Sequence, residues 1–342
     1  MPRGRALIGV SLAILLSIAA RSHPDRVQAA PEEGWVVREL LARARVFPEV
    51  GPGVSAIKRD SRGRYYILSA PKDLIAVYSP AGERVGRIPN TNSRDATLIY
   101  AADMDLDPDG RLFVADRGAN AVKLFDPAGS RVATIPVVAP TSLVALSGGE
   151  CAVVSLRSDH LVRIFNVHGE LVRSFGDLPD AGTIEQNPLS SRGRVSGDPA
   201  GHIYFAFSYL PEPTFRKYDR YGYRAFEWSL RSPEVASEGQ AERHEFITLE
   251  RHRGAPRENS GMNALGVDPD TEEIWAAVGD ELLEFDKDGT RRAAYRVSTR
   301  EGARIAPDAI LVEPDRILLA ADPLGIFDFA RPEKPHPERR PD

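Results

Sequence analysis

The feature that most constrains the fold of this chain is an internal repeat. Six stretches share one pattern, at residues 54–89, 101–138, 142–178, 193–230, 263–298 and 308–330. In each, short runs rich in Val, Ile, Leu, Phe and Tyr alternate with Gly, Asp, Asn or Pro, which is typical of strands joined by tight turns. A glycine recurs between the third and fourth runs, as at Gly82 and Gly129, because a tight turn needs a residue that tolerates a positive φ.

The spacing of the repeats predicts the architecture. Residues 31–330 provide 50 residues for each of the six repeats. A four-stranded propeller blade takes about 40–50 residues. The sequence therefore predicts an all-β chain that forms one domain, a six-bladed β-propeller of four-stranded blades.

The last repeat lacks a fourth run, because the proline-rich sequence of residues 331–342 follows it. We predict that this tail is disordered and dispensable. Residues 35–47 are expected to supply the missing strand and so close the ring. The alternative is a short N-terminal helix, since residues 38–45 contain good helix formers. We favour the strand because an open ring would leave two sheet edges unpaired.

The first thirty residues predict export. Arg3 and Arg5 precede an uncharged run at residues 6–20, and small residues follow as far as Ala30, as in a secretory signal peptide. Cleavage after Ala20 or after Ala29 is expected. A retained membrane anchor is the alternative, but a run of 15 residues is shorter than the ~20 that span a bilayer. We therefore predict a periplasmic or secreted protein without stable membrane insertion.

Charge and cysteine content narrow the function classes. A net charge of −5 without a basic stripe argues against a nucleic-acid partner. The single cysteine, Cys151, excludes an intramolecular disulfide and a multi-cysteine metal cluster. It lies in an apolar run, so we expect it to be buried and inert.

The second repeat resembles the NHL repeat. The residues that carry the resemblance are Asp109, Gly110, Leu112, Phe113, Val114, Ala115, Asp116, Asn120, Val122, Leu124, Phe125, Asp126 and Gly129. The resemblance implies an NHL-type six-bladed propeller over about residues 35–330. Such propellers include lactone hydrolases, amidating lyases, scaffolds and carbohydrate binders, so the function must come from a site.

Two metal sites can be tested against the sequence. Residues 105–110, with Asp116 six residues further on, follow the pattern of a calcium-binding loop, but in a repeat they favour a hairpin turn. The lactone hydrolases of this fold hold a divalent metal at the channel mouth. Alignment of the repeats places Asn263 and Asp308 at that level, and Asp103 joins them after a one-residue slip. This set is poor for calcium, which takes 6–8 oxygen ligands. A metal-dependent hydrolase or lyase, with a divalent metal such as calcium, is therefore the alternative function.

The leading function is binding without catalysis and without a cofactor. Every sizeable insertion, at residues 90–100, 179–192, 209–214 and 231–261, belongs to the ring face that carries the blade-to-blade crossings. Long loops on a rigid scaffold commonly carry function, so we predict recognition of a protein or glycan there. Residues 234–253 are expected to form a helix. The candidate contact residues are Phe246, Ile247, Leu249, Arg251, His252, Arg253, Tyr209 and His160.

Overall fold

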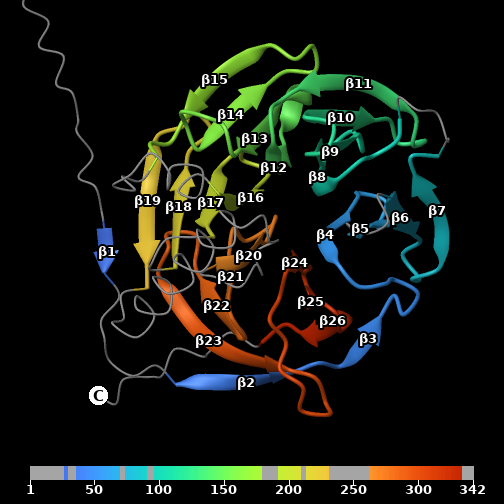
Figure 1. The fold of residues 1–342 in the computed structure, drawn as a ribbon. Coiled ribbons are helices and arrows are strands. Elements are labelled where there is room, and N and C mark those ends of the chain that lie inside the picture. Colours follow the sequence, from blue (N-terminus) through green and yellow to red (C-terminus); the bar gives the residue numbers. More distant parts are fainter. Residues whose placement is uncertain are drawn as a thin grey trace, which may run out of the picture.

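The computed structural model describes residues 27–29, 36–69, 74–90, 96–178, 192–208, 213–230 and 262–332. Six β-sheets stand around one axis like the blades of a propeller (Figure 1). Each blade has four antiparallel strands. In blades 1 to 5 the chain passes from the innermost strand outward before it crosses to the next blade, whereas the outermost strand of blade 6 comes from the N-terminal segment. The prediction of a six-bladed all-β propeller is confirmed.

Blades 1 to 3 follow one another along the chain. Blade 1 consists of β4 (Val54–Arg59), β5 (Tyr65–Ser69), β6 (Leu74–Tyr78) and β7 (Arg84–Ile88). Blade 2 consists of β8 (Ala101–Leu106), β9 (Leu112–Asp116), β10 (Ala121–Phe125) and β11 (Arg131–Pro136). Blade 3 consists of β12 (Pro140–Ala145), β13 (Cys151–Ser155), β14 (Val162–Phe165) and β15 (Leu171–Phe175).

Blades 4 to 6 complete the ring. Blade 4 consists of β16 (Gly193–Gly197), β17 (Ile203–Phe207), β18 (Thr214–Tyr218) and β19 (Arg224–Ser229). Blade 5 consists of β20 (Met262–Val267), β21 (Ile274–Val278), β22 (Glu281–Phe285) and β23 (Arg291–Ser298). Blade 6 consists of β24 (Ala309–Val312), β25 (Arg316–Ala321), β26 (Gly325–Ala330) and β3 (Ala44–Val46).

The apolar core lies between neighbouring blades. Every residue of the two middle strands of blade 2, β9 and β10, is buried, whereas residues of the outer strand β11 are half-buried or exposed except for the buried Ile135. Middle strands are covered by a blade on each side, so they read as continuous apolar runs. Among the described residues, six clusters of buried apolar side chains each span two adjacent blades; Phe113 of blade 2 and Phe165 of blade 3, for example, share one cluster.

The ring closes through the N-terminal segment. β3 pairs antiparallel with β26, with Val46 opposite Ile326, and the innermost strands β24 and β4 are in contact. The segment at 35–47 is therefore extended, as predicted, but only β3 completes blade 6. β2 (Val37–Leu41) instead pairs in parallel with β23 of blade 5, and β1 (Val27–Ala29) pairs in parallel with β19 of blade 4.

Two backbone hydrogen bonds explain why β2 pairs with blade 5 and β3 pairs with blade 6. The amide of Ala42 donates to the carbonyl of Ser298 in blade 5 (3.0 Å), and the next amide, of Arg43, donates to the carbonyl of Asp328 in blade 6 (2.7 Å). Two consecutive amides thus bind different blades, so the segment divides into two strands. The sequence predicts one strand in residues 35–47, because an open ring would leave sheet edges unpaired, and does not predict this division into two strands.

The first residue of the predicted tail, Arg331, contacts the last two blades. The guanidinium of Arg331 forms ion pairs with Asp268 and Glu273 of blade 5, and its Nη1 donates to the carbonyl of Glu313 in blade 6 (3.3 Å). Arg331 therefore joins the last two blades instead of starting a free tail. Residues 333–342 lie outside the described part of the chain, so their predicted disorder stays a prediction.

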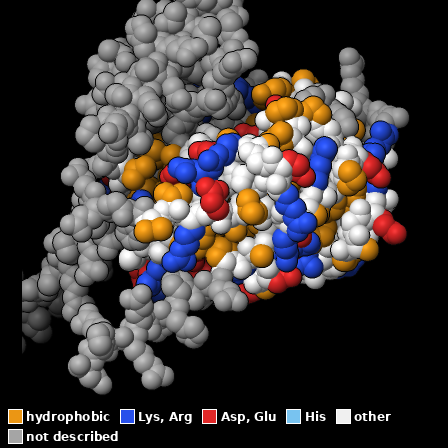
Figure 2. Space-filling view, turned by 90° about the horizontal axis from the view of Figure 1, so that it is seen from below, with side chains coloured by type: hydrophobic (Ala, Val, Ile, Leu, Met, Phe, Trp, Pro, Cys, Tyr) orange, Lys and Arg blue, Asp and Glu red, His pale blue; other side chains and the backbone are white. Residues whose placement is uncertain are grey.

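The outer wall mixes charged and apolar side chains. Figure 2 views the ring from the side along which β2 and β3 run, where Lys and Arg side chains stand between hydrophobic and acidic ones. Charged side chains lie between the described hydrophobic ones that are visible in this view. The described residues include no helix that is long and apolar enough to cross a membrane.

Candidate functional site

The two ends of the ring differ in their connections. We call the end that carries the turns between first and second strands, and between third and fourth strands, the turn face. The other end, with the turns between second and third strands and the blade-to-blade crossings, is the crossing face. The strand order puts the connections β15–β16, β17–β18 and β19–β20 on the crossing face, and all three adjoin blade 4; the first and the last are the longest on that face.

Most predicted contact residues on the crossing face lie outside the described residues. These are Tyr209, Phe246, Ile247, Leu249, Arg251, His252 and Arg253, together with the helix expected at residues 234–253. Their role in binding stays a prediction.

His160 is the predicted contact residue that the structure describes. It lies in the connection between β13 and β14, on the crossing face, and its Nδ1 is 3.1 Å from Oδ1 of Asp159. The hydrogen bond from His160 lowers the pKa of Asp159. His160 keeps 36% of its side chain exposed, so it remains accessible from solvent.

Asp103, a predicted metal ligand, is occupied by protein donors. Its Oδ1 accepts the amide of Met104 (2.8 Å), and its Oδ2 accepts the hydroxyl of Ser142 (2.5 Å) and the amide of Leu143 (3.1 Å). Ser142 Oγ in turn accepts the amide of Val195 (3.1 Å). Burial raises the pKa of Asp103, against the opposing attraction of Arg194 and Lys58. This carboxylate therefore links blades 2, 3 and 4 and is not free to bind a metal.

The second acid of β8 is also engaged. Lys58 Nζ lies 3.0 Å from Oδ1 of Asp105, whose Oδ2 accepts the amide of Ala145 (3.0 Å). Burial acts to lower the pKa of Lys58, but attraction by Asp105 and Asp103 outweighs it, so the pKa is raised. The calcium-loop pattern at residues 105–110 is thus a hairpin turn, as the repeat predicts. Its Asp107 binds Arg111 (Nε to Oδ2, 2.7 Å).

Asp308, a second predicted metal ligand, is engaged by a backbone amide and acted on by a cation. Asp308 Oδ2 accepts the amide of Asp322 (2.8 Å), and burial raises the pKa of Asp308, while Arg194 acts to lower it. Arg194 thus acts electrostatically on both Asp103 and Asp308. Within the described part of the chain, no hydrogen bond or ion pair joins Asn263, Asp308 and Asp103. A guanidinium so close to two of three predicted ligands repels a divalent cation.

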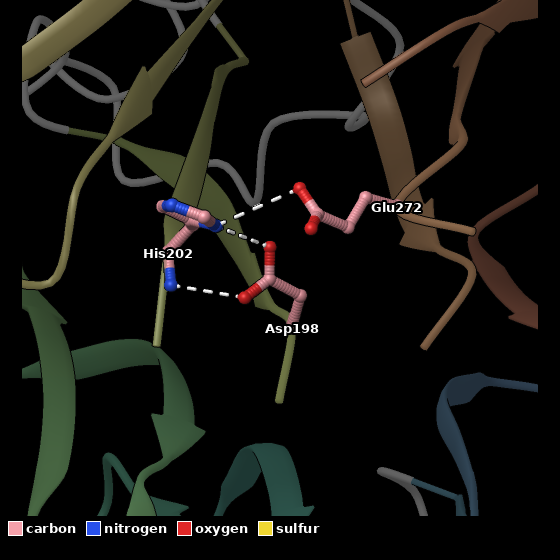
Figure 3. A group of neighbouring side chains, drawn as sticks. All are labelled: Asp198, His202 and Glu272. Atoms are coloured by element: carbon pink, nitrogen blue, oxygen red, sulfur yellow. Dashed lines mark hydrogen bonds and ion pairs between the residues drawn. The ribbon is translucent and has the colours of Figure 1, made fainter. Parts of the chain in front are cut away.

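The sequence analysis missed one group that is able to hold a metal. Asp198, His202 and Glu272 bring their ligand atoms within 4.8 Å of one another, on the turn face between blades 4 and 5 (Figure 3). His202 Nδ1 is 2.8 Å from Asp198 Oδ2 and 3.7 Å from Glu272 Oε2. Among the described residues this is the one cluster of three such ligands.

Repetition of the same contacts in other blades identifies this group as structural. In blade 1, Arg64 Nε and the Tyr66 hydroxyl both donate to Asp60 Oδ2 (2.7 and 3.3 Å). In blade 4, His202 and the Tyr204 hydroxyl (2.9 Å) occupy the same places around Asp198 Oδ2. The signal in the sequence is an aspartate that begins the turn, with a base four residues later.

Glu272 is likewise engaged. Its Oε2 lies 3.1 Å from Lys217 Nζ, which also donates to the carbonyl of Lys287 (3.1 Å). An ammonium bound to one of the three ligands opposes a metal cation there. The group is best explained as the blade 4 version of a repeated turn clamp, extended by a contact to blade 5.

Comparison with known proteins supports the fold. No family model matches the chain, and no curated protein matches it. Virginiamycin B lyase from Staphylococcus aureus is structurally similar, with 13% identity, a TM-score of 0.50, and coverage of 85% of this chain and 88% of that one. U3-55K has 10% identity and a TM-score of 0.53, over 84% and 98% of the two chains. The WD40 repeats of RRP9 have 10% identity and a TM-score of 0.53, over 85% and 99%.

These similar structures include a lyase and WD40 repeats. At such low identity they share the fold with this chain and nothing finer, and the NHL assignment stays a prediction. What the sequence, the structure and the comparisons together establish is that this chain forms a six-bladed β-propeller.

Proposed function

We propose that this chain is an exported, NHL-like propeller that binds a protein or glycan partner through insertions on its crossing face, without catalysis. The observation that carries the proposal is the position of the two longest of these connections, β15–β16 and β19–β20, both of which adjoin blade 4. Loops gathered at one side of a rigid ring form one continuous recognition surface. The leader sequence supports export to the periplasm or the exterior.

The protein contacts made by the predicted metal ligands also support a binding function over a metal-dependent catalytic one. Asp103 links three blades through its hydrogen bonds, and Arg194 acts on both Asp103 and Asp308. Residues that hold blades together and face a guanidinium make a poor metal cage, so no divalent metal is part of the proposal.

Deletion of residues 236–256 behind a short Gly-Ser linker tests the proposal. The wild-type protein and the deletion variant are cross-linked to material from the cell envelope, and partners are identified by mass spectrometry and glycan analysis. A matched control carries the same linker inserted between Pro80 and Ala81, in a blade 1 turn on the turn face. Circular dichroism and melting temperature establish that each variant is folded.

We expect the control to recover the wild-type partner and the deletion variant to lose it. A folded deletion variant that recovers the same partner at wild-type yield would overturn the assignment to this face. A deletion variant that does not fold would show that the insertion packs on blades 4 and 5, contrary to its assignment as a recognition element.

A further inference from the structure

The turn face has an open cleft between blades 3 and 4. Its volume is about 600 Å³. The lining residues come from four loops and strands: Leu146, Ser147, Glu150, Arg173, Pro199, Ala200, Gly201, Arg220 and Tyr221. None of these residues belongs to the predicted crossing-face site or forms a hydrogen bond or ion pair with Asp103, Asp105 or Asp308, so the cleft is a separate feature.

Arg220 and Tyr221 depart from the repeat at this point. The turn between third and fourth strands has one backbone form in five blades, closed by a bond from the glycine amide to the carbonyl three residues earlier, as from Gly82 to Ser79 (2.9 Å) and from Gly222 to Asp219 (2.9 Å). The two central residues are Pro-Ala in blades 1 and 2, Val-His in blade 3 and Lys-Asp in blade 5, whereas blade 4 alone among these five turns pairs a guanidinium with a phenol ring, as Arg-Tyr. The turn itself therefore does not require a guanidinium and an aromatic ring, and another role must account for them.

The Arg-Tyr pair is organised for binding. Arg220 Nη2 donates to the Tyr221 hydroxyl (2.6 Å), and its guanidinium carbon lies 4.8 Å from the centre of the Tyr221 ring. The side chain of Tyr221 nevertheless remains 62% exposed. Arg220 forms no ion pair with an acid in the described part of the chain. Among the described residues, its positive charge is thus held next to an exposed ring without an acidic partner.

The base of the cleft is fixed by Arg173. Its Nη1 is 3.3 Å from Oε2 of Glu150 in blade 3, and its Nη2 donates to the carbonyl of Arg220 in blade 4 (3.0 Å). This bridge holds the Arg220 backbone against blade 3. Because Glu150 is balanced by Arg173, the net charge of the cleft is the single positive charge of Arg220.

We propose that this cleft binds an acidic carbohydrate, with the carboxylate of a uronic acid residue on Arg220 and the sugar ring against Tyr221. A guanidinium binds a carboxylate through paired, charge-assisted hydrogen bonds. The C–H face of a pyranose packs on an exposed aromatic ring, and its hydroxyls find polar partners in Ser147 and Glu150. The wall at Pro199, Ala200 and Gly201 carries no charged or long side chain, so it leaves room for a flat ring.

The corresponding cleft between blades 5 and 6 supports this specificity by contrast. It has a volume of about 400 Å³ and is lined by Asp268, Asp270, Thr271, Pro314, Asp315, Arg331 and Pro332. Acids outnumber bases there and no aromatic ring is present. An acidic sugar therefore has its complementary charge and stacking surface at the cleft between blades 3 and 4, not at the one between blades 5 and 6.

Titration calorimetry with hexagalacturonate tests the proposal, with a neutral galactose hexamer as the matched ligand. The variants are Arg220→Gln, which removes the charge, and Tyr221→Ala, which removes the ring. Tyr223→Ala is the control, because Tyr223 is 75% exposed in the same turn but does not line the cleft. Variant folding is checked by melting temperature.

We expect hexagalacturonate to bind the wild-type protein and the Tyr223→Ala variant equally, and more weakly at high salt. The Arg220→Gln variant should lose about tenfold or more in affinity, the range expected when a charge-assisted hydrogen bond is removed. The Tyr221→Ala variant should also bind more weakly, because it lacks the ring on which the sugar packs. Equal affinity for the neutral hexamer, or unchanged affinity in a folded Arg220→Gln variant, would overturn the proposal. Preference for a phosphotyrosine peptide over hexagalacturonate would assign the cleft to a peptide instead. The deletion of residues 236–256 alters the other face, so the result is independent of the partner proposed above.

Discussion

Truncation of the chain after Ala330 should destabilise the propeller, although composition alone marks the tail as dispensable. The Arg331 side chain is 14% exposed and pairs with Asp268 (3% exposed) and Glu273 (14% exposed). Removal of Arg331 leaves the buried carboxylate of Asp268 without its cation and takes one partner from Glu273, and breaking a buried pair in this way costs about 3–5 kcal/mol. Asp268 keeps the amides of Asp270 (2.8 Å) and Thr271 (3.1 Å), so we expect about 3 kcal/mol, the lower end of that range.

The assay compares chains that end at Ala330 and at Pro332 by differential scanning calorimetry. At about 2 °C for each kcal/mol in a chain of this size, the shorter protein should melt about 6 °C below the longer one. A full-length Arg331→Met variant should show a similar decrease, which separates the ion pairs from the end of the chain. Melting temperatures within about 1 °C of each other, well under the shift expected for one broken buried pair, would refute the reasoning.

Three further predictions follow from the buried polar groups. Asp103→Ala leaves the Ser142 hydroxyl and the Leu143 amide without their acceptor, so the free energy of unfolding in urea should decrease by about 2–4 kcal/mol; an unchanged midpoint would contradict this. Burial acts to raise the pKa of Asp268, but hydrogen bonds from the amides of Asp270 and Thr271 and from Arg331 outweigh it and lower the pKa. Its stabilising contribution is therefore complete above the unfolded pKa of about 3.9 and is lost as pH falls through the lower folded pKa, so an Asp268→Asn variant should lose less stability than wild type between about pH 4 and pH 2. Burial raises the pKa of the Cys151 thiol to about 12, so a thiol reagent at neutral pH should label it only after denaturation, and labelling of the native protein would contradict its burial.

The fold was predictable because the same pattern of strands and turns recurs six times in the sequence. Alternating apolar runs and turn glycines mark nearly every strand, and the position of Cys151 in such a run correctly predicted its burial. The division of the N-terminal segment into β2 and β3 was not predictable. It depends on the amides of Ala42 and Arg43 reaching different blades, and backbone contacts of this kind leave no trace in the side-chain pattern.

The candidate sites were harder to predict because their chemistry depends on neighbours from other blades. Asp103 looks like a metal ligand along the sequence, but in space Ser142 and Leu143 of the next blade occupy its carboxylate. Arg331 looks like the start of a tail, but it meets acids some sixty residues earlier in blade 5. The Arg220–Tyr221 departure from the repeat was visible in the sequence, and comparison of equivalent turns was the signal that could have found it.

We infer that Asp103 and Asp308 accept hydrogen bonds within the propeller and do not form a catalytic metal site. Elemental analysis of the purified protein after dialysis against metal-free buffer distinguishes the two roles, with the Asp308→Ala variant in parallel. We expect well below one divalent ion per chain in both proteins and no change in melting temperature on addition of a chelator. One tightly held ion per wild-type chain that is lost in the Asp308→Ala variant would instead establish a metal site.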